Sequence, residues 1–176
     1  MIKLGSKELR TTIADEDIKK TLKKNPIYII CDNILDTYNV GSIFRLADAV
    51  AAEKVFLCGI TETPPNTRIK KASINTTEWV NWEYSETTLS AIKKLKKEVK
   101  DIQMVAVEQS EKSVPYNKAN YKFPIALIVS NEISGAEQEV LDEADLIVEM
   151  PMFGVNKSLN VMVSLGIILY QVVQKF

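Results

Sequence analysis

The chain has 176 residues, 46% of them hydrophobic and 26% charged, and a formal net charge of −1. These values predict one globular domain with a core of its own, and no apolar run reaches the ~18–20 residues of a membrane-spanning helix. The sequence has no histidine, which excludes serine-triad hydrolysis, histidine-based acid–base catalysis and histidine metal sites. With only Cys31 and Cys58, a zinc site is also excluded, and we expect no metal.

Hydrophobic periodicity predicts alternating helices and strands. In chain order we expect a helix at 15–22, a strand at 27–31, a loop at 32–39, a helix at 42–52, a strand at 54–58, a loop at 61–77, a strand at 79–82, a helix at 85–100, strands at 103–107 and 124–129, a helix at 136–143, a strand at 145–149 and a helix at 161–173. The strand at 27–31 is a continuous apolar run, as in strands buried on both faces.

This alternation predicts an α/β fold with a mostly parallel sheet and helices on both of its faces. We place a short N-terminal extension at residues 1–25 and one domain at residues 26–176. Residues 1–7 lack the apolar segment of a secretory signal, and both cysteines end apolar runs. We therefore predict a cytoplasmic protein with two buried free thiols and no contact with a membrane.

Three polar clusters follow predicted strands, where α/β proteins bind their ligands. They are Asn39–Arg45, Ser130–Gly135 and the joint between the last strand and the last helix, Met150–Asn160. Irregular backbone between buried segments needs hydrogen-bond partners, and a bound ligand is one source of them. We therefore expect a ligand site where these clusters meet.

Each cluster also has a purely structural interpretation. Asn39 or Ser42 could cap the helix after the first strand, Ser158 could cap the last helix, and Arg45 could pair with Asp48. Neither GxxxxGK[ST] nor GxGxxG occurs in the sequence, which counts against a Walker-type nucleotide site and a Rossmann dinucleotide site.

Taken together, the clusters resemble three motifs of the SpoU (TrmH) family of RNA ribose 2′-O-methyltransferases, within the SPOUT superfamily. The similar segments are residues 39–49 (NVGSIFRLADA), 128–135 (IVSNEISG) and 150–161, where MPM leads to SLNV. The resemblance covers the chain from about Pro26 to its end. It implies a C-terminal trefoil knot, a homodimer, and transfer of a methyl group from S-adenosylmethionine to RNA.

The resemblance also implies a set of site residues. The catalytic set carried over to this sequence is Asn39, Arg45, Glu132, Ser158 and Asn160. The cofactor-binding set is Val107, Ser130, Asn131, Glu132, Gly135, Met150, Gly154 and Leu159. Position 130 departs from the family, which usually has glycine there, so a side chain is added beside the cofactor.

Two roles for Arg45 follow from the resemblance and from chemistry. Proposals for the family make this arginine the general base, yet a guanidinium is effectively never deprotonated in proteins. Binding of the RNA phosphate and stabilisation of the developing alkoxide are physically safer roles. For Glu132 we favour a role in organising the second motif over a role as base.

The RNA would have to be recognised by the domain surface, because only about 25 residues precede the first strand. Candidates are residues 68–71, the N-terminal helix, and Trp79 with Trp82, although the tryptophans suit core or dimer packing better than base stacking. We interpret the lysines at 93–97 as a solvated helix face.

The leading function is thus an S-adenosylmethionine-dependent RNA 2′-O-methyltransferase, with tRNA ahead of rRNA as its substrate. A non-catalytic RNA-binding or assembly protein that keeps the fold is the alternative. A different nucleotide-binding α/β enzyme is a third possibility, disfavoured by the missing phosphate loop.

Overall fold

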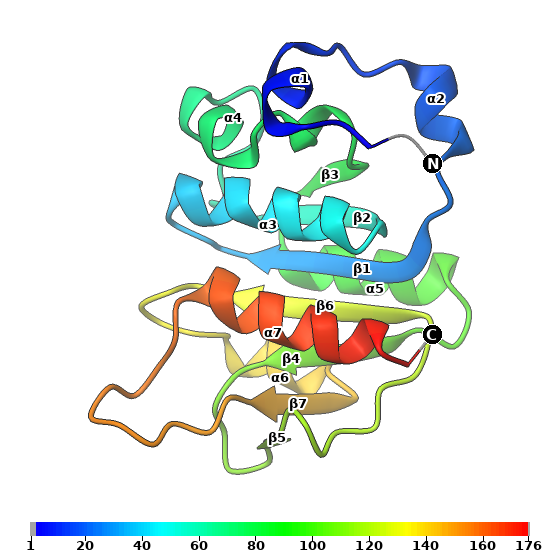
Figure 1. Cartoon of the computed structure of the whole chain (residues 1–176). Helices are drawn as coiled ribbons and strands as arrows, with labels where there is room; N and C mark the ends of the chain where they lie inside the picture. Colours follow the sequence, from blue (N-terminus) through cyan, green and yellow to red (C-terminus); the bar gives the residue numbers. More distant parts are fainter. Residues whose placement is uncertain (1–2, 176) are drawn as a thin grey trace.

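The computed structural model describes residues 3–175, and its centre is one seven-stranded sheet (Figure 1). Every neighbouring pair of strands is parallel. The strands are β1 (Asn25–Asp32), β2 (Ala52–Cys58), β3 (Trp82–Ser85), β4 (Gln103–Val107), β5 (Val114–Pro115), β6 (Ile125–Ser130) and β7 (Leu146–Glu149). Across the sheet they lie in the order β3-β2-β1-β6-β4-β7-β5.

Helices cover both faces of the sheet, which confirms the predicted fold class. They are α1 (Ser6–Thr11), α2 (Glu16–Thr21), α3 (Thr37–Ala49), α4 (Thr67–Ser73), α5 (Thr88–Glu98), α6 (Gln138–Asp142) and α7 (Val161–Val173), with a 3₁₀ helix, η1, at Thr76–Glu78. One core cluster joins the sheet to α3, α4 and α7, and a second joins its other face to α5 and α6. Figure 1 shows α3 and α7 lying side by side across the sheet.

Successive residues of each central strand enter opposite cores, as the pleat of a strand requires. Ile29 lies in the cluster with α3 and α7, and its neighbour Ile30 lies in the cluster with α5. Cys31 and Cys58 are likewise in different clusters, so the sheet separates their thiols. Burial raises the pKa of the Cys31 thiol well above its ordinary value and that of Cys58 to about 12, so both stay protonated at neutral pH.

Helix α3 begins at Thr37, five residues before the predicted start at Ser42. The Asp36 side chain caps it by accepting a hydrogen bond from the Tyr38 N–H at 2.8 Å. Asn39 and Ser42 therefore lie inside the helix, and the interpretation of either residue as its cap is wrong. Asn39 is 6% exposed, which is unusual for a helical asparagine and points to a specific partner.

The long loop predicted at residues 61–77 is in fact partly helical, since it contains α4 and the start of η1. Asn66 caps α4, and packing against α3 stabilises this short helix. The strand expected at residues 79–82 lies three residues later, at β3. Its displacement leaves Trp79 in a turn, where it is 6% exposed and belongs to the interior, as expected for this tryptophan.

Close packing of α3 on α4 requires glycine at position 41. A Cβ there would lie 2.6 Å from the Cβ of Ala72 and 2.7 Å from the carbonyl oxygen of Ile69. Replacing Gly41 with alanine should lower the free energy of unfolding by about 1–3 kcal/mol, because the clash with backbone exceeds the gain of about 1 kcal/mol in helix propensity. Chemical denaturation measures this change.

The matched control for that substitution is Gly154→Ala. No atom lies within 4 Å of a Cβ at Gly154, so its replacement should leave the free energy of unfolding unchanged or raise it by up to about 1 kcal/mol. Equal effects of the two substitutions would contradict the close-packing argument.

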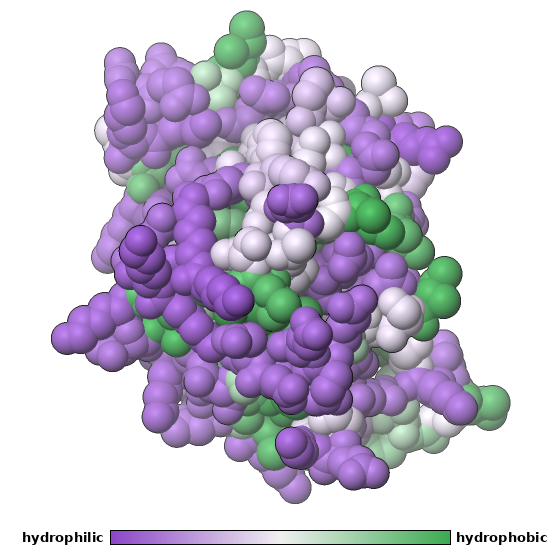
Figure 2. Space-filling model, turned by 180° about the vertical axis from the view of Figure 1, so that it is seen from behind, coloured by the Kyte–Doolittle hydropathy of each residue, from purple (hydrophilic) through white to green (hydrophobic). Residues whose placement is uncertain are grey.

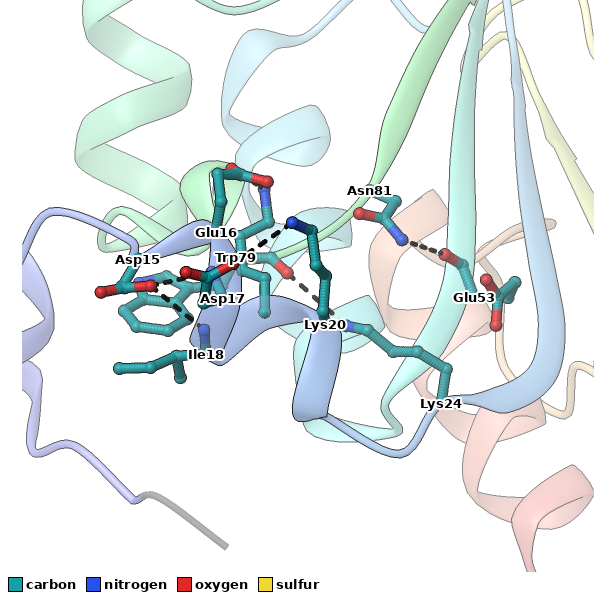
Figure 3. A network of polar contacts seen from close by, with 10 residues as sticks. Asp15, Glu16, Asp17, Ile18, Lys20, Lys24, Glu53, Trp79 and Asn81 are labelled. Atoms are coloured by element: carbon teal, nitrogen blue, oxygen red, sulfur yellow. Dashed lines mark hydrogen bonds and ion pairs between the residues drawn. The ribbon is translucent and has the colours of Figure 1, made fainter.

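The N-terminal extension packs on the domain instead of standing apart from it. The Asn75 side-chain amide donates hydrogen bonds to the carbonyl oxygens of Leu9 and Thr12, both at 3.2 Å. Figure 3 shows α2 over the Trp79 ring, with Asp15 capping the helix and the Lys24 ammonium donating to the Trp79 carbonyl at 3.5 Å. The helix predicted at 15–22 is confirmed, α1 is additional, and the division at residue 25 stays a prediction.

The face that carries α5 is largely hydrophilic in Figure 2, and hydrophobic groups protrude along its right-hand edge. The strand arrows in Figure 1 point to the left, and the view of Figure 2 is turned by 180°. The right-hand edge in Figure 2 is therefore where the strands end. Within residues 3–175, no helix has the length and apolar character needed to cross a membrane.

Candidate active site

A pocket of about 510 Å³ lies beyond the carboxyl ends of β4, β6 and β7. This volume falls in the range of small-molecule sites. Its lining residues are Val107, Glu108, Gln109, Ser130, Asn131, Glu132, Ile133, Ser134, Gly135, Val148, Glu149, Met150, Asn156, Lys157, Ser158, Leu159, Asn160, Val161 and Ser164. The second and third polar clusters of the sequence thus meet at one site.

Most of the residues expected to bind a cofactor line this pocket. They are Val107, Ser130, Asn131, Glu132, Gly135, Met150 and Leu159. Gly154 does not line it and lies in the exposed part of the loop between β7 and α7. Met150, 8% exposed, joins the core of the sheet directly to the pocket wall.

Three of the expected catalytic residues form one chain of hydrogen bonds. The Asn160 Nδ2 donates to Asn39 Oδ1 at 3.0 Å, and the Asn39 Nδ2 donates to Glu132 Oε1 at 2.8 Å. Asn160 also caps α7, since its Oδ1 accepts from the Met162 N–H at 2.9 Å. The chain therefore joins the start of α7, the interior of α3 and the loop after β6, and it explains why Asn39 is buried.

The Glu132 carboxylate accepts two further hydrogen bonds, from the N–H groups of Leu35 at 2.9 Å and Asp36 at 3.2 Å. Burial alone raises the pKa of this carboxyl, but the hydrogen bonds from Leu35, Asn39 and Asp36 outweigh it, so the pKa lies below its ordinary value. An ionised carboxylate with these donors holds the loop before α3 in place. The geometry favours this organising role over proton abstraction.

The loop after β6 is shaped by Asn131. Its Oδ1 accepts from the N–H groups of Ile133 at 2.9 Å and Ser134 at 3.0 Å, and its Nδ2 donates to the Asn33 carbonyl at 2.9 Å. Gly135 closes the turn with φ of +68°, a conformation that favours glycine. Asn131 thus presents the loop to the pocket and joins it to the end of β1.

Arg45 and Ser158 stand apart from the hydrogen-bonded chain. Arg45 is exposed on α3, does not line the pocket, and forms no ion pair with Asp48 or any other acidic side chain among residues 3–175. Ser158 lines the pocket and is exposed. Asn160, not Ser158, caps α7, so the structural interpretations of both Arg45 and Ser158 are wrong.

Several lining residues were not predicted, among them Glu108, Gln109, Val148, Glu149 and Ser164. Glu108 and Gln109 are neighbours that contact the two loops of the pocket. Glu108 Oε2 accepts from the Ala136 N–H at 3.1 Å, and Gln109 Nε2 donates to the Lys157 carbonyl at 2.6 Å. These neighbours connect the end of β4 to both of the loops that line the pocket. Their position directly after a strand was the available signal, by the same strand-end rule that indicated the other clusters.

Among the described residues, no group of three or more cysteine, aspartate or glutamate side chains is arranged to hold a metal ion. The pocket wall instead combines apolar side chains such as Val107, Met150 and Leu159 with a larger number of polar and charged side chains. This combination suits an organic ligand of nucleoside size.

A parallel α/β sheet with such a pocket at the carboxyl ends of its strands defines a ligand-binding α/β domain. Residues 26–170 match the model of the SpoU rRNA Methylase family. The chain therefore belongs to this family. Residues 128–135 and 150–161 contribute to the pocket wall, and Asn39 of the first segment is hydrogen-bonded to Glu132 and Asn160 beside it.

Relatives in this family modify different RNAs. The chain is 31% identical to the tRNA (guanosine(18)-2'-O)-methyltransferase of Aquifex aeolicus, over 85% of this chain and 69% of the relative. It is 28% identical to a 23S rRNA (guanosine-2'-O-)-methyltransferase of Neisseria meningitidis, over 88% of this chain and 60% of the relative. The crystal structure of an AdoMet-bound rRNA methyltransferase from Sinorhizobium meliloti superposes with a TM-score of 0.79 at 27% identity, over 87% of this chain and 57% of that chain. The chain thus spans about 60% of the length of the last two.

Proposed function

We propose that the protein is an RNA 2′-O-methyltransferase that uses S-adenosylmethionine, with tRNA ahead of rRNA as its substrate. The observation that carries this proposal is the chain from Asn160 through Asn39 to Glu132, which joins all three family motifs beside one pocket. The curated relatives act on tRNA or rRNA, which supports RNA as the partner.

The pocket suits S-adenosylmethionine in size and lining. Val107, Met150 and Leu159 offer apolar contact, and the loop around Asn131 and Gly135 offers backbone groups for a purine. When bound, the cofactor supplies a methyl group on a sulfonium centre. No metal is needed for its transfer, and the AdoMet-bound S. meliloti protein supports the assignment.

The side chains of this protein would position the RNA and stabilise the negative charge that develops on the ribose 2′-oxygen. Asn39 and Asn160 orient the reacting groups by hydrogen bonds, Ser158 contributes a hydroxyl at the pocket mouth, and Glu132 keeps the loop before α3 in place. The Arg45 guanidinium holds an RNA phosphate and stabilises the ribose 2′-oxygen as that oxygen loses its proton. The proton leaves to phosphate or water, and much of the acceleration comes from alignment.

The direct test is transfer of labelled methyl from S-adenosylmethionine to total small RNA that lacks modifications, followed by nucleoside analysis. A 2′-O-methylated nucleoside is the expected product. Absence of transfer to both tRNA and rRNA, together with absence of cofactor binding, would favour the non-catalytic RNA-binding alternative.

Helix α4 offers a surface for the RNA backbone. Arg68 and Lys71 are exposed, share one face of the helix, and have no ion pair among the described residues. Reversing both charges (R68E/K71E) should weaken binding of an unmodified tRNA transcript about 10-fold and reduce its salt dependence by roughly two ion contacts. Fluorescence anisotropy at several salt concentrations measures both effects.

Helix α5 provides the matched control, because Lys93 and Lys97 are also exposed and unpaired but lie on the opposite face of the sheet. The K93E/K97E variant has the same change in net charge and should bind tRNA much more tightly than the α4 variant. If the two double variants lost the same affinity, only overall charge would matter and α4 would not be the docking surface.

A homodimer is supported by helix α7, which leaves an apolar stripe uncovered in one chain. Val163, Ile167 and Tyr170 recur at helical spacing and are 40%, 37% and 53% exposed. A second copy is the occupant we propose, with the stripe at its interface. Sedimentation equilibrium should give twice the mass of one chain, and Ile167→Glu should shift the equilibrium toward the monomer.

The trefoil knot and the location in the cytoplasm are further parts of the proposal. The knot is supported by the path of the chain, which returns from β7 near one edge of the sheet to pack α7 on β6 and α3. A crystal structure tests it by tracing whether residues after 150 pass through the loop between β4 and β6. Buried free thiols support a reducing compartment, and cell fractionation tests that assignment.

A further inference from the structure

The wall of the proposed cofactor pocket carries an excess of negative charge. Glu108, Glu132 and Glu149 line it, and of the described residues in the lining only Lys157 is basic. Glu132 is engaged by three donors from the loop before α3 and from Asn39. These donors are neutral, so all three carboxylates contribute to the negative potential that a ligand meets, while Glu132 has the least hydrogen-bonding capacity left for a ligand.

Glu108 is the carboxylate that the structure fixes in place on this wall. Its Oε1 accepts from the Gln109 N–H at 2.9 Å, and its Oε2 accepts from the Ala136 N–H at 3.1 Å. A carboxylate has about four lone-pair sites, so two backbone donors leave capacity for a ligand. No cationic side chain among residues 3–175 forms an ion pair with Glu108.

Gly135 permits this placement. A Cβ at position 135 would lie 2.7 Å from Glu108 Oε2, so any side chain there would push the carboxylate away. Glycine therefore suits position 135 in two ways, through its positive φ and through the space that lets the Glu108 carboxylate approach. The loop of the second motif thus packs against the carboxylate of Glu108, the residue directly after β4.

We propose that Glu108 is a specificity-determining residue, whose fixed carboxylate makes the pocket favour the cationic methyl donor over the neutral thioether product. This inference rests on the proposed function, which assigns S-adenosylmethionine to the pocket. The donor differs from S-adenosylhomocysteine by one methyl group and one positive charge. A partly enclosed carboxylate attracts that charge, so it favours entry of the donor and release of the product.

Calorimetric titration of the full chain with each ligand, in the absence of RNA, tests the proposal. Glu108→Gln should weaken binding of S-adenosylmethionine about 10-fold and change that of S-adenosylhomocysteine by less than about 2-fold, because only the donor carries the extra charge. Glu111→Gln is the matched control, since Glu111 is exposed in the next turn and does not line the pocket. An equal loss of both ligands would overturn the proposal and give Glu108 a purely structural role.

A second measurement needs no variant, which matters because the glutamine would disturb the hydrogen bonds that hold Glu108. In the wild-type chain, the ratio of the two dissociation constants should approach one as the salt concentration rises from about 0.05 M to about 0.5 M, since salt screens the charge. A preference that is independent of salt would overturn the proposal. If the wild type bound neither ligand, the proposed cofactor itself would be wrong, and binding of both with equal loss in the variant would refute only the role of Glu108.

Discussion

Replacing Arg45 with alanine should lower the rate of methyl transfer about 100-fold or more while leaving the affinity for S-adenosylmethionine within about 2-fold of wild type. The rate falls because a guanidinium that holds phosphate and stabilises a developing alkoxide acts only when RNA is present. The affinity persists because Arg45 is exposed on α3 and lies outside the pocket lining. Single-turnover methylation and calorimetry measure the two quantities separately.

Arg45→Lys provides the control for charge alone. Lysine keeps the positive charge but loses the planar, bidentate geometry of the guanidinium, so we expect a rate between those of wild type and the alanine variant. Near-normal turnover of Arg45→Ala would show that the reacting ribose lies elsewhere. A loss of cofactor affinity in that variant would instead place Arg45 in the architecture of the pocket.

The elements that the sequence predicted best are those decided by continuous apolar runs. The bounds of β4 and α7 agree with the prediction, because each is a continuous apolar run with fully buried residues such as Met104 and Leu165. The segment 61–77 was missed because Pro64 and Pro65 indicate a loop, while α4 owes its stability to packing against Gly41. The two-residue strand β5 is too short to give a periodic signal.

The site could be predicted as a set of residues but not as an arrangement. Spacing along the sequence says nothing about the contact between Asn39 and Glu132, which are 93 residues apart. It also hid Glu108, which no motif singled out and whose partner Ala136 lies 28 residues later. Tertiary contacts of this kind decide which polar residues act together, and only the folded chain shows them.

Asn160 connects stability and function, and two substitutions should separate its roles. Asn160→Ala removes the cap of α7 and the donor to Asn39, so the free energy of unfolding should fall by about 1 kcal/mol or more. Asn160→Asp keeps an oxygen that accepts from the Met162 N–H and suits the helix dipole, so it should lose less stability than Asn160→Ala, with the remaining loss coming from the missing donor to Asn39 Oδ1. Thermal and chemical denaturation measure both values.

Methyl transfer should respond differently from stability. The aspartate variant cannot donate to Asn39 Oδ1, so the chain that orients Asn39 toward Glu132 is broken even though α7 stays capped. We expect its turnover to fall about 10-fold to 100-fold, close to that of the alanine variant, because a small misplacement in an aligned site is costly. If Asn160→Asp instead kept both its stability and its turnover, capping would be the whole role of Asn160. Asn39 would then have to be oriented by Glu132 alone.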